Sequence, residues 1–579
     1  MITKDVLQGV APVTNFNTHK IIEKILKPDY LLAIFLVFHT TIAFSATTVI
    51  PASSEVELYN TFTLKISRSD ITTNKFFEFP KIVFTKGSKS FVVEGFFDGD
   101  ENGDSTGNIW KARFMPDEIG QWEYSWDFNG DQGTGTFNTI AQTNALVHGH
   151  VKRTGRFLKT DNGKGFIYKG SNWPDTRRYR VNEADFSNTF ISTQDWVNYI
   201  NRLSETNHNG TTMVSLDRLI NNDRASFDLA WTKKIDFAIE VAANNGIYVV
   251  MGLLSTWGRS ASDPYVTVES SSGQILNPWN NTLMAEKEFY LRYMAARFSG
   301  YYNIIWEIGN EMERYPNNGS NFTTLANTYY LPWLRGYDPY DIPITISEGI
   351  YKDINVDIGG LHQGENIGIN ESLPIIHTEL VSISGATGTL WGGKACRNSN
   401  NRKYYRRTIW KGMAQGGSGS IECSLPFSGP DPFTSMDSFL ANANVRNVME
   451  DHGRFSVFLS SLINEVYELI PLVSSNFGTA NVQYAVRGKA GEEYIAYFYG
   501  DVGTGVELSV NLPAGNYTMQ WMSPASGQYS TPEALANNGS ISSPWANEYD
   551  VALRIYSTTA SPTEAPGKVN NFQLRIIRK

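Results

Sequence analysis

Two glutamates each follow an apolar run of the kind that forms a buried strand. Residues 303–311 read NIIWEIGNE, and the apolar run stops at Asn310 and Glu311. Residues 374–379 read PIIHTE, so Glu379 stands in the same place relative to its own strand. If both strands belong to one parallel barrel, their carboxyl ends form one mouth. The sequence therefore predicts that the two carboxyl groups face a shared space.

Two facing carboxyl groups can cleave a glycosidic bond. One donates a proton to the leaving oxygen, and in a retaining enzyme the other attacks the anomeric carbon. The two roles require different pKa values. The acid must be partly desolvated to stay protonated, whereas the nucleophile must be held ionised by hydrogen bonds.

Other glutamates are alternatives for these roles. Glu307 lies four residues before Glu311, on the same face of the strand and one layer lower, and is the alternative acid. Glu348 follows the strand expected at 343–347 and is the alternative nucleophile. Glu365 and Glu371 lie in loop-like sequence and are expected to be solvated.

Residues at other strand ends could contact the same substrate. His362 ends the sixth expected strand, where it could bind a sugar or the nucleophile. Aromatic faces can stack on sugar rings, and arginines can hold an acidic or sulfated sugar. These further candidates are Trp173, Trp257, Trp391, Tyr351, Arg177 and Arg178. Core or loop packing is the alternative for the aromatic residues, and a surface position is the alternative for His362 and the arginines.

The elements that must position these residues alternate between strand and helix from 155 to 468. This alternation predicts a (β/α)8 TIM barrel. Its strands are expected at 166–170, 212–216, 247–254, 303–309, 343–347, 356–361, 374–378 and 419–424. Helical segments include 227–245 and 283–298, and Trp306 is expected in the core.

Two regions flank the barrel. Residues 50–148 show short alternating runs separated by Gly, Asp and Asn turns, which predict an N-terminal β-sandwich. The strand pattern returns at 470–579 and predicts a C-terminal β-sandwich. The chain is thus expected to be multidomain, with a central barrel between two β-sandwiches. We expect these to buttress the barrel, with glycan binding as the alternative.

Residues 1–46 are expected to be a leader. An apolar run at 30–44 follows three lysines and precedes a small-x-small sequence, as in a signal peptide. An uncleaved anchor is the alternative. Either reading places the folded part outside the cytoplasm, as a secreted, periplasmic or cell-surface protein. There Cys396 and Cys423 could form a disulfide, with two buried free thiols as the alternative.

Composition limits the remaining function classes. The 579 residues carry a net charge of −9 and include 32 Phe, 29 Tyr and 14 Trp. Mild acidity provides no basic footprint for nucleic acid. Two cysteines exclude a disulfide scaffold or a four-cysteine zinc site. The aromatic excess is consistent with a sugar ligand, because exposed rings form flat apolar platforms.

One segment resembles a calcium loop. Oxygen-bearing side chains alternate along it, and Gly103 occupies the sixth position. The alternating residues are Asp98, Asp100, Asn102 and Asp104. Ile109 stands where such a loop has Glu, so a polar hairpin turn is favoured over structural calcium. No other metal or cofactor is expected.

The barrel pattern resembles clan A of the glycoside hydrolases. The matching features are Asn310-Glu311 after the fourth strand and Glu379 after the seventh. The resemblance implies a retaining enzyme in which Glu311 is the general acid/base and Glu379 is the nucleophile. It also implies that Asn310 binds the sugar 2-hydroxyl.

The N-terminal region resembles a sandwich module that precedes such barrels in bacterial polysaccharide-degrading enzymes. The matching segments are 79–80 (FP), 95–99 (GFFDG), 110–116 (WKARFMP) and 120–122 (GQW). We therefore expect hydrolysis of a polysaccharide or its oligosaccharides. A carbohydrate-binding protein built on a lapsed barrel and a transglycosylase are the alternatives. The sugar, the linkage, endo or exo action and the oligomeric state do not follow from the sequence.

Overall fold

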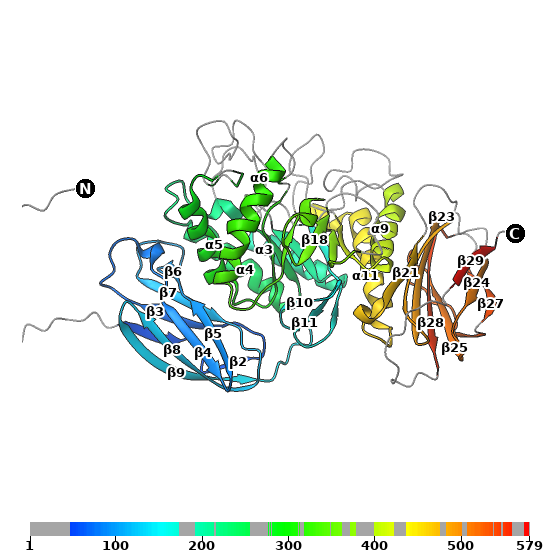
Figure 1. Cartoon of the computed structure of the whole chain (residues 1–579), viewed down its shortest axis with the longest axis horizontal. Coiled ribbons are helices and arrows are strands. Elements are labelled where there is room, and N and C mark those ends of the chain that lie inside the picture. The colour runs from blue at the N-terminus through cyan, green and yellow to red at the C-terminus, as the bar shows by residue number, and fades with distance from the viewer. Residues whose placement is uncertain are drawn as a thin grey trace, which may run out of the picture.

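The computed structural model has three units along its length (Figure 1). It describes residues 47–172, 192–213, 216–254, 276, 278–279, 281–310, 312, 318–347, 349–361, 371–377, 399–421, 436–474, 482–500, 507–536, 538–545, 548–558 and 573–577. Sheets form the two outer units, and strands surrounded by helices form the central one. Within these ranges, no helix has the length and apolar character needed to cross a membrane.

The central unit is a closed barrel of eight parallel strands. In order they are β13 (Lys169–Asn172), β14 (Gly210–Met213), β15 (Tyr248–Gly252), β16 (Ile304–Glu307), β17 (Ile344–Ile346), β18 (Ile358–Leu361), β19 (Ile375–His377) and β20 (Ser418–Ile421). Strand β20 pairs with β13 and closes the ring. The TIM-barrel prediction is confirmed, and Trp306 is fully buried as expected.

The first barrel strand begins later in the chain than expected. Gly165–Phe166 forms β12, which pairs with β11 (Phe157–Thr160) and not with the barrel. Strand β11 also pairs with β10 (Val151–Thr154), so these strands make a small separate sheet. The expected strand at 166–170 was therefore wrong in its start, because this pairing takes Phe166 out of the barrel.

Helices surround the barrel. The principal ones are α3 (Thr193–Glu205), α4 (Leu229–Asn244), α5 (Met284–Phe298), α6 (Asn318–Leu325), α7 (Leu331–Tyr337), α9 (Arg402–Ala414), α10 (Met436–Ala441) and α11 (Ala443–Ser460). A π-helical turn, η4 (Ala326–Tyr330), joins α6 to α7. Local sequence sets where some of them start: the Asp228 side chain accepts the Trp231 N–H and caps α4.

The N-terminal unit has two sheets. One contains β1 (Thr48–Pro51), β3 (Phe62–Ser67), β7 (Ile109–Phe114) and β6 (Phe96–Gly99). The other contains β2 (Glu55–Glu57), β9 (Asp131–Ile140), β8 (Gly120–Phe128), β4 (Lys81–Lys86) and β5 (Lys89–Glu94). Aromatic rings pack between them: Phe62 lies 3.8 Å from Phe137 and Phe84 lies 4.2 Å from Phe114, centroid to centroid.

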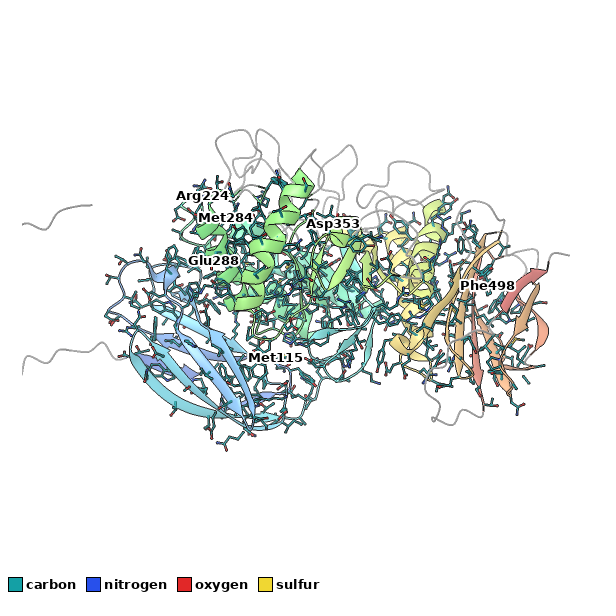
Figure 2. The ribbon with its side chains drawn as sticks, in the orientation of Figure 1. Met115, Arg224, Met284, Glu288, Asp353 and Phe498 are labelled. Carbon is teal, nitrogen blue, oxygen red and sulfur yellow. The ribbon has the colours of Figure 1, made fainter. Side chains whose placement is uncertain are left out.

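The C-terminal unit also has two sheets. The larger contains β21 (Ile470–Ser474), β22 (Val482–Lys489), β23 (Glu493–Gly500), β28 (Asp550–Ser557), β25 (Tyr517–Met522) and β26 (Glu533–Leu535). The smaller contains β27 (Asn538–Ser542), β24 (Glu507–Asn511) and β29 (Gln573–Ile577). Phe498, labelled in Figure 2, is fully buried in the core of this unit.

A buried ionic network joins the N-terminal unit to the barrel. Asp236 of α4 accepts two hydrogen bonds from Arg113 of β7, at 2.8 and 2.9 Å, and two from Arg297 of α5, at 3.2 and 2.6 Å. Arg297 also lies 2.8 Å from Asp98 of β6. Burial alone would raise the pKa of Asp98, but Arg297 and Lys111 outweigh it and lower the pKa to about 2. These charges are desolvated but mutually paired.

The interface between the N-terminal unit and the barrel, called the seam below, also contains a backbone contact. The N–H of Met115, labelled in Figure 2, donates to the Tyr340 hydroxyl at 2.7 Å, and Met115 is buried. A comparable network joins the barrel to the C-terminal unit. Arg406 of α9 binds Asp451 of α11 at 3.0 Å and Asp550 of β28 at 2.8 Å. Both outer units are thus fixed to the barrel through buried arginines.

Candidate active site

The described part of the candidate site begins where β16 ends. Beyond the strand, the chain keeps hydrogen bonding to both neighbours. The Asn310 N–H donates to the Leu254 carbonyl at 2.9 Å, on the side of β15. The Ser347 N–H donates to the Gly309 carbonyl at 3.1 Å, on the side of β17. Asn310 is therefore held at the carboxyl end of the barrel, where TIM-barrel active sites lie.

The Asn310 side chain is fixed as well. Only 1% of the residue is exposed, and Nδ2 donates to Ser347 Oγ at 3.4 Å. A side chain that must bind one substrate hydroxyl benefits from such support, because a locked rotamer keeps its donors in place. The expected role of Asn310 at the sugar 2-hydroxyl stays a prediction.

Both neighbours of Glu311 in the chain are anchored. Met312 is fully buried, and its carbonyl accepts a hydrogen bond from Trp279 Nε1 at 3.1 Å. A Cβ on Gly309 would lie 2.7 Å from Met312 Cγ and 2.7 Å from Phe322 Cζ, so glycine allows this close packing. Glu311 itself lies outside the described residues, but the chain enters and leaves it from fixed positions.

Glu307 points into the barrel, as the sequence predicts. The preceding residue, Trp306, donates its Nε1–H to Asp338 at 3.3 Å, and Asp338 directly follows helix α7, outside the barrel. Since successive side chains of a strand face opposite sides, Glu307 faces inward. It is fully buried and lies between Gly252 of β15 and Thr345 of β17 in the register.

An aromatic ring occupies the barrel interior at β13 and β14. The Tyr168 ring lies against the backbone of two glycines: a Cβ on Gly170 or Gly210 would come within 2.4 or 2.1 Å of it. Its hydroxyl lies 3.3 Å from Thr212 Oγ1. Burial raises the pKa of Tyr168, and the nearby Glu307 raises it further. The interior therefore combines a buried carboxyl group with hydroxyl groups.

The second predicted carboxylate follows β19. This strand ends at His377, which pairs with Leu361 of β18 and Gly419 of β20. Glu379 lies two residues farther along, outside the described residues. In the barrel order, β17 and β18 separate β16 from β19. The carboxyl ends of the two strands therefore open at the same mouth, with Glu307 and Asn310 on one side of it.

Tyr351 is the one other predicted site residue that the structure describes. It lies in the short helix η5 (Gly349–Lys352) after β17. Its ring packs where a Cβ on Gly359 would lie 2.7 Å away, and only 5% of the residue is exposed. Burial, and then Glu371, raise the pKa of Tyr351. Little of its ring is open to a ligand, and its role stays a prediction.

Several further predicted residues fall outside the described ranges. They are Trp173, Arg177, Arg178, Trp257, Glu348, His362, Glu365, Trp391, Cys396 and Cys423. Their predicted roles and the disulfide are therefore retained only as predictions.

Two buried charged residues near the mouth were not predicted. Asp217 and Arg218 lie in the short helix η3 (Leu216–Leu219) that follows β14, and they are 4% and 3% exposed. Burial raises the pKa of Tyr290, and the Asp217 charge raises it further, while the Tyr290 hydroxyl donates to the Leu253 carbonyl at 2.8 Å. In the sequence, a charged pair directly after an apolar run is the signal that could have identified these two residues.

The segment that resembles a calcium loop is the hairpin between β6 and β7. Asp98 is already paired with Arg297 and Lys111. Asp100 Oδ1 accepts the N–H groups of Asn102 and Asp104 at 2.7 and 2.9 Å, which is how a tight polar turn satisfies itself. Across the described ranges, no group of three or more His, Cys, Asp or Glu side chains is placed to hold a metal.

Sequence comparisons agree with this geometry. Residues 152–355 match the family described as apiosidase-like, catalytic domain, a range that contains β13 to β17 and Asn310-Glu311. Residues 55–129 match a domain of unknown function, DUF5060. A stretch of 229 residues is 26% identical to an endoglucanase from Clostridium saccharobutylicum. That match covers 39% of this chain and 42% of the endoglucanase, so the chain spans less than half of that relative.

These matches support a glycoside hydrolase.

Solved structures share the fold. A candidate glycoside hydrolase from Bacteroides vulgatus aligns with a TM-score of 0.64 at 16% identity, covering 87% of this chain and all of that one. A glycoside hydrolase of family 5 from the same organism aligns with a TM-score of 0.51 at 14% identity, covering 72% of this chain and 95% of that one. At these identities the likeness concerns the fold alone, and the chemistry has to be argued from the site.

Proposed function

We propose that this protein hydrolyses O-glycosidic bonds of a polysaccharide, or of oligosaccharides derived from it, with retention of configuration. The observation that carries the proposal is the anchored Asn310 at the carboxyl end of β16, which directly precedes Glu311 in the sequence. A carboxyl group after this strand and another after β19 provide the acid and the nucleophile that double displacement needs. The apiosidase-like match over the first five barrel strands supports the same class of chemistry.

In this mechanism Glu311 first acts as an acid and then as a base. It protonates the leaving oxygen while Glu379 attacks the anomeric carbon and forms a covalent glycosyl-enzyme. Glu311 then removes a proton from the water that hydrolyses this ester. Asn310 binds the 2-hydroxyl, and Ser347 keeps its carboxamide oriented for that contact.

The rest of the binding site is assigned by the same proposal. His362 and the aromatic candidates Trp173, Trp257 and Trp391 form sugar subsites around the mouth, whereas Tyr351, which is 5% exposed, offers little of its ring to a sugar. Arg177 and Arg178 serve an acidic or sulfated unit of the substrate. The protein acts after export through its N-terminal leader, and the two outer β units are sandwiches that buttress the barrel through their arginine networks.

The test is release of reducing sugar from a panel of plant and algal polysaccharides by the full chain. Once a substrate is found, Glu311→Gln and Glu379→Gln should each lose activity by roughly a hundredfold or more, because a carboxamide can neither donate a proton nor form the covalent ester. Circular dichroism and the thermal midpoint should stay as in the parent protein.

Glu371→Gln is the matched control. This glutamate lies in the segment before β19 and makes an ion pair with the exposed Lys352 at 3.5 Å. Its removal should leave activity within about twofold. Full activity in Glu311→Gln or Glu379→Gln would refute the role given to that residue. Glycan binding without product from any substrate would refute hydrolysis and favour a binding protein.

A further inference from the structure

A cleft of about 430 Å³ opens at the end of the barrel opposite the candidate active site. It is lined by the starts of β12 and β13, the end of α11 and the segment that follows it. The residues used below are Lys164, Lys169, Asn209, Leu462, Ile463 and Glu465. Lys169 is the first residue of β13, so the cleft lies at the amino end of the barrel. Its volume falls within the range of small-molecule sites, about 300–1,000 Å³.

Lys169 supplies a cation to this cleft. Its Nζ donates to Ser456 Oγ at 2.6 Å, and that hydroxyl donates in turn to the Asn207 carbonyl at 2.8 Å. Within the part of the chain that is described, no carboxylate makes an ion pair with it. Burial lowers the pKa of Lys169 to about 8. An ammonium group has three donors, and here one of them is used by the protein.

The titratable groups that lie close to Lys169 are two histidines, His208 and His452, and neither is an acid. His208 Nε2 and His452 Nδ1 are 2.9 Å apart, and His208 Nδ1 lies 2.9 Å from Thr206 Oγ1. Both histidines are buried. Burial, followed by the charge of Lys169, lowers the pKa of His208 to about 3, so this pair is neutral and adds no negative charge. The two histidines therefore do not neutralise the cation.

The acid that lines the cleft is already engaged. Glu465 Oε2 accepts the Gly165 N–H at 2.8 Å, and Oε1 lies 3.5 Å from Lys164 Nζ at the exposed rim. Asn209 is engaged too: its Oδ1 accepts the Lys169 N–H at 2.7 Å and its Nδ2 donates to the Ile167 carbonyl at 2.9 Å. The N–H donors of Lys169 that Ser456 does not use are therefore available to a ligand in the cleft.

We propose that this cleft binds a small oxyanion, a carboxylate or a phosphate, whose oxygen atoms accept hydrogen bonds from Lys169. Lys169 is partly buried and has no ion pair among the described residues, and an anion in the cleft would offset the cost of desolvating it. Apolar side chains stand beside the lysine, and Ile463 is 60% exposed. Ile463 and Leu462 can cover an apolar body attached to the anionic group. This site is separate from the proposed catalysis at the other end of the barrel.

The experiment measures thermal unfolding of the full chain at pH 7 in inorganic phosphate and in hexanoate, each against sodium chloride of equal ionic strength. An anion that binds only the folded state raises the midpoint as its concentration rises. We expect such a rise for the parent protein and for Lys81→Met, which removes an exposed lysine of β4 that does not line the cleft. Lys169→Met should lose it. A larger rise with hexanoate than with phosphate indicates an anion with an apolar body, and the reverse indicates a bare oxyanion.

A second variant avoids any folding defect of Lys169→Met. Ile463→Glu adds a carboxylate at the exposed rim, and its repulsion should weaken binding of either anion by roughly tenfold or more in isothermal titration. The proposal is overturned if neither anion shifts the parent protein beyond sodium chloride. It is equally overturned if Lys169→Met or Ile463→Glu, once folded, binds the anions as the parent does.

Discussion

The two ends of the barrel differ in the charges that the fold places there. At the carboxyl end, the described side chains at the end of β16 are an inward carboxyl group, Glu307, and an anchored carboxamide, Asn310. At the amino end they are Lys169, His208 and His452, and the acid that lines the cleft there, Glu465, is already bonded to the Gly165 N–H and to Lys164. An acidic end suits proton donation and nucleophilic attack. A basic end cannot do that chemistry, and it suits either stability or an anion.

The seam with the N-terminal unit and the carboxyl end of the barrel also differ in the contacts that hold them. The seam to the N-terminal unit meets helices α4 and α5 through the carboxylate of Asp236, held between two arginines. The site end is held by backbone bonds from Asn310 and by the close packing at Gly309. Ionic networks therefore fix the outer units, whereas strand continuation and glycine packing position the proposed catalytic group. Each prediction below changes one of these contacts or the charges at one end of the barrel.

The largest effect on stability is expected at the seam. Asp236→Asn would leave Arg113 and Arg297 buried with an incomplete partner, since both bind this carboxylate. Removing one member of such a network costs about 3–5 kcal/mol. Urea unfolding should show this loss, while activity per folded molecule stays unchanged because the site end is not touched.

Asp117→Asn is the control for that prediction. Asp117 forms a 2.7 Å ion pair with Lys89 on the same unit, but both side chains are partly exposed. An exposed pair is worth about 1 kcal/mol or less. Equal losses in the two variants would contradict the account, because burial would then not be what makes the seam strong.

A smaller loss of stability, with a loss of activity, is expected at the site end. A Cβ at position 309 would lie 2.7 Å from both Met312 and Phe322, so Gly309→Ala must move one of them. We expect a loss of about 1–3 kcal/mol and, because Glu311 lies between the displaced positions, a fall in kcat of roughly a hundredfold. Gly336→Ala is the control, since nothing lies within 4 Å of its Cβ position. An unchanged kcat in Gly309→Ala would show that this packing does not position the acid.

The amino end should control part of the pH dependence of stability. In the unfolded chain His208 titrates near its ordinary pKa of 6.5, but in the folded protein burial and Lys169 hold the pKa at about 3. The unfolded state therefore binds more protons between these values. The free energy of unfolding should fall as the pH drops through this window, by up to about 1.4 kcal/mol per pH unit.

His208→Gln separates this effect from the titration of carboxylates in the same range. The variant should show a shallower dependence of unfolding free energy on pH between 6.5 and 3 than the parent, measured by urea unfolding at several pH values. Parallel curves for the two proteins would contradict a buried neutral histidine pair.

The sequence predicts the barrel well because the signal is local. Apolar runs alternate with helical spacing, and α4 begins one residue after its capping Asp228. The start of the first strand could not be predicted in the same way. Gly165–Phe166 looks like a strand and is one, but its partner is β11 rather than the barrel. Which strand pairs with which depends on contacts between distant parts of the chain, and a run of residue types does not record them.

Burial of charge was hidden for the same reason. Nothing in the sequence marks Asp217 as buried, and only the folded chain shows what surrounds it. The aromatic excess is a poor indicator of a sugar ligand, because many of the rings fill the cores of the three units. Among the described residues, five tryptophans are 0% exposed: Trp110, Trp122, Trp196, Trp306 and Trp410. What the sequence did indicate about the site is the strand-end position of its polar residues, and Asn310 confirms the location of one of them.

The most direct test of the proposed mechanism is chemical rescue with azide. The substrate is an activated aryl glycoside of the sugar that the polysaccharide panel identifies. Glu379→Ala should be inactive alone, and azide should restore turnover by taking the place of the missing nucleophile. The product should then be a glycosyl azide of inverted anomeric configuration, which proton NMR determines. Rescue with inversion in Glu348→Ala, and none in Glu379→Ala, would contradict the assignment and place the nucleophile after β17.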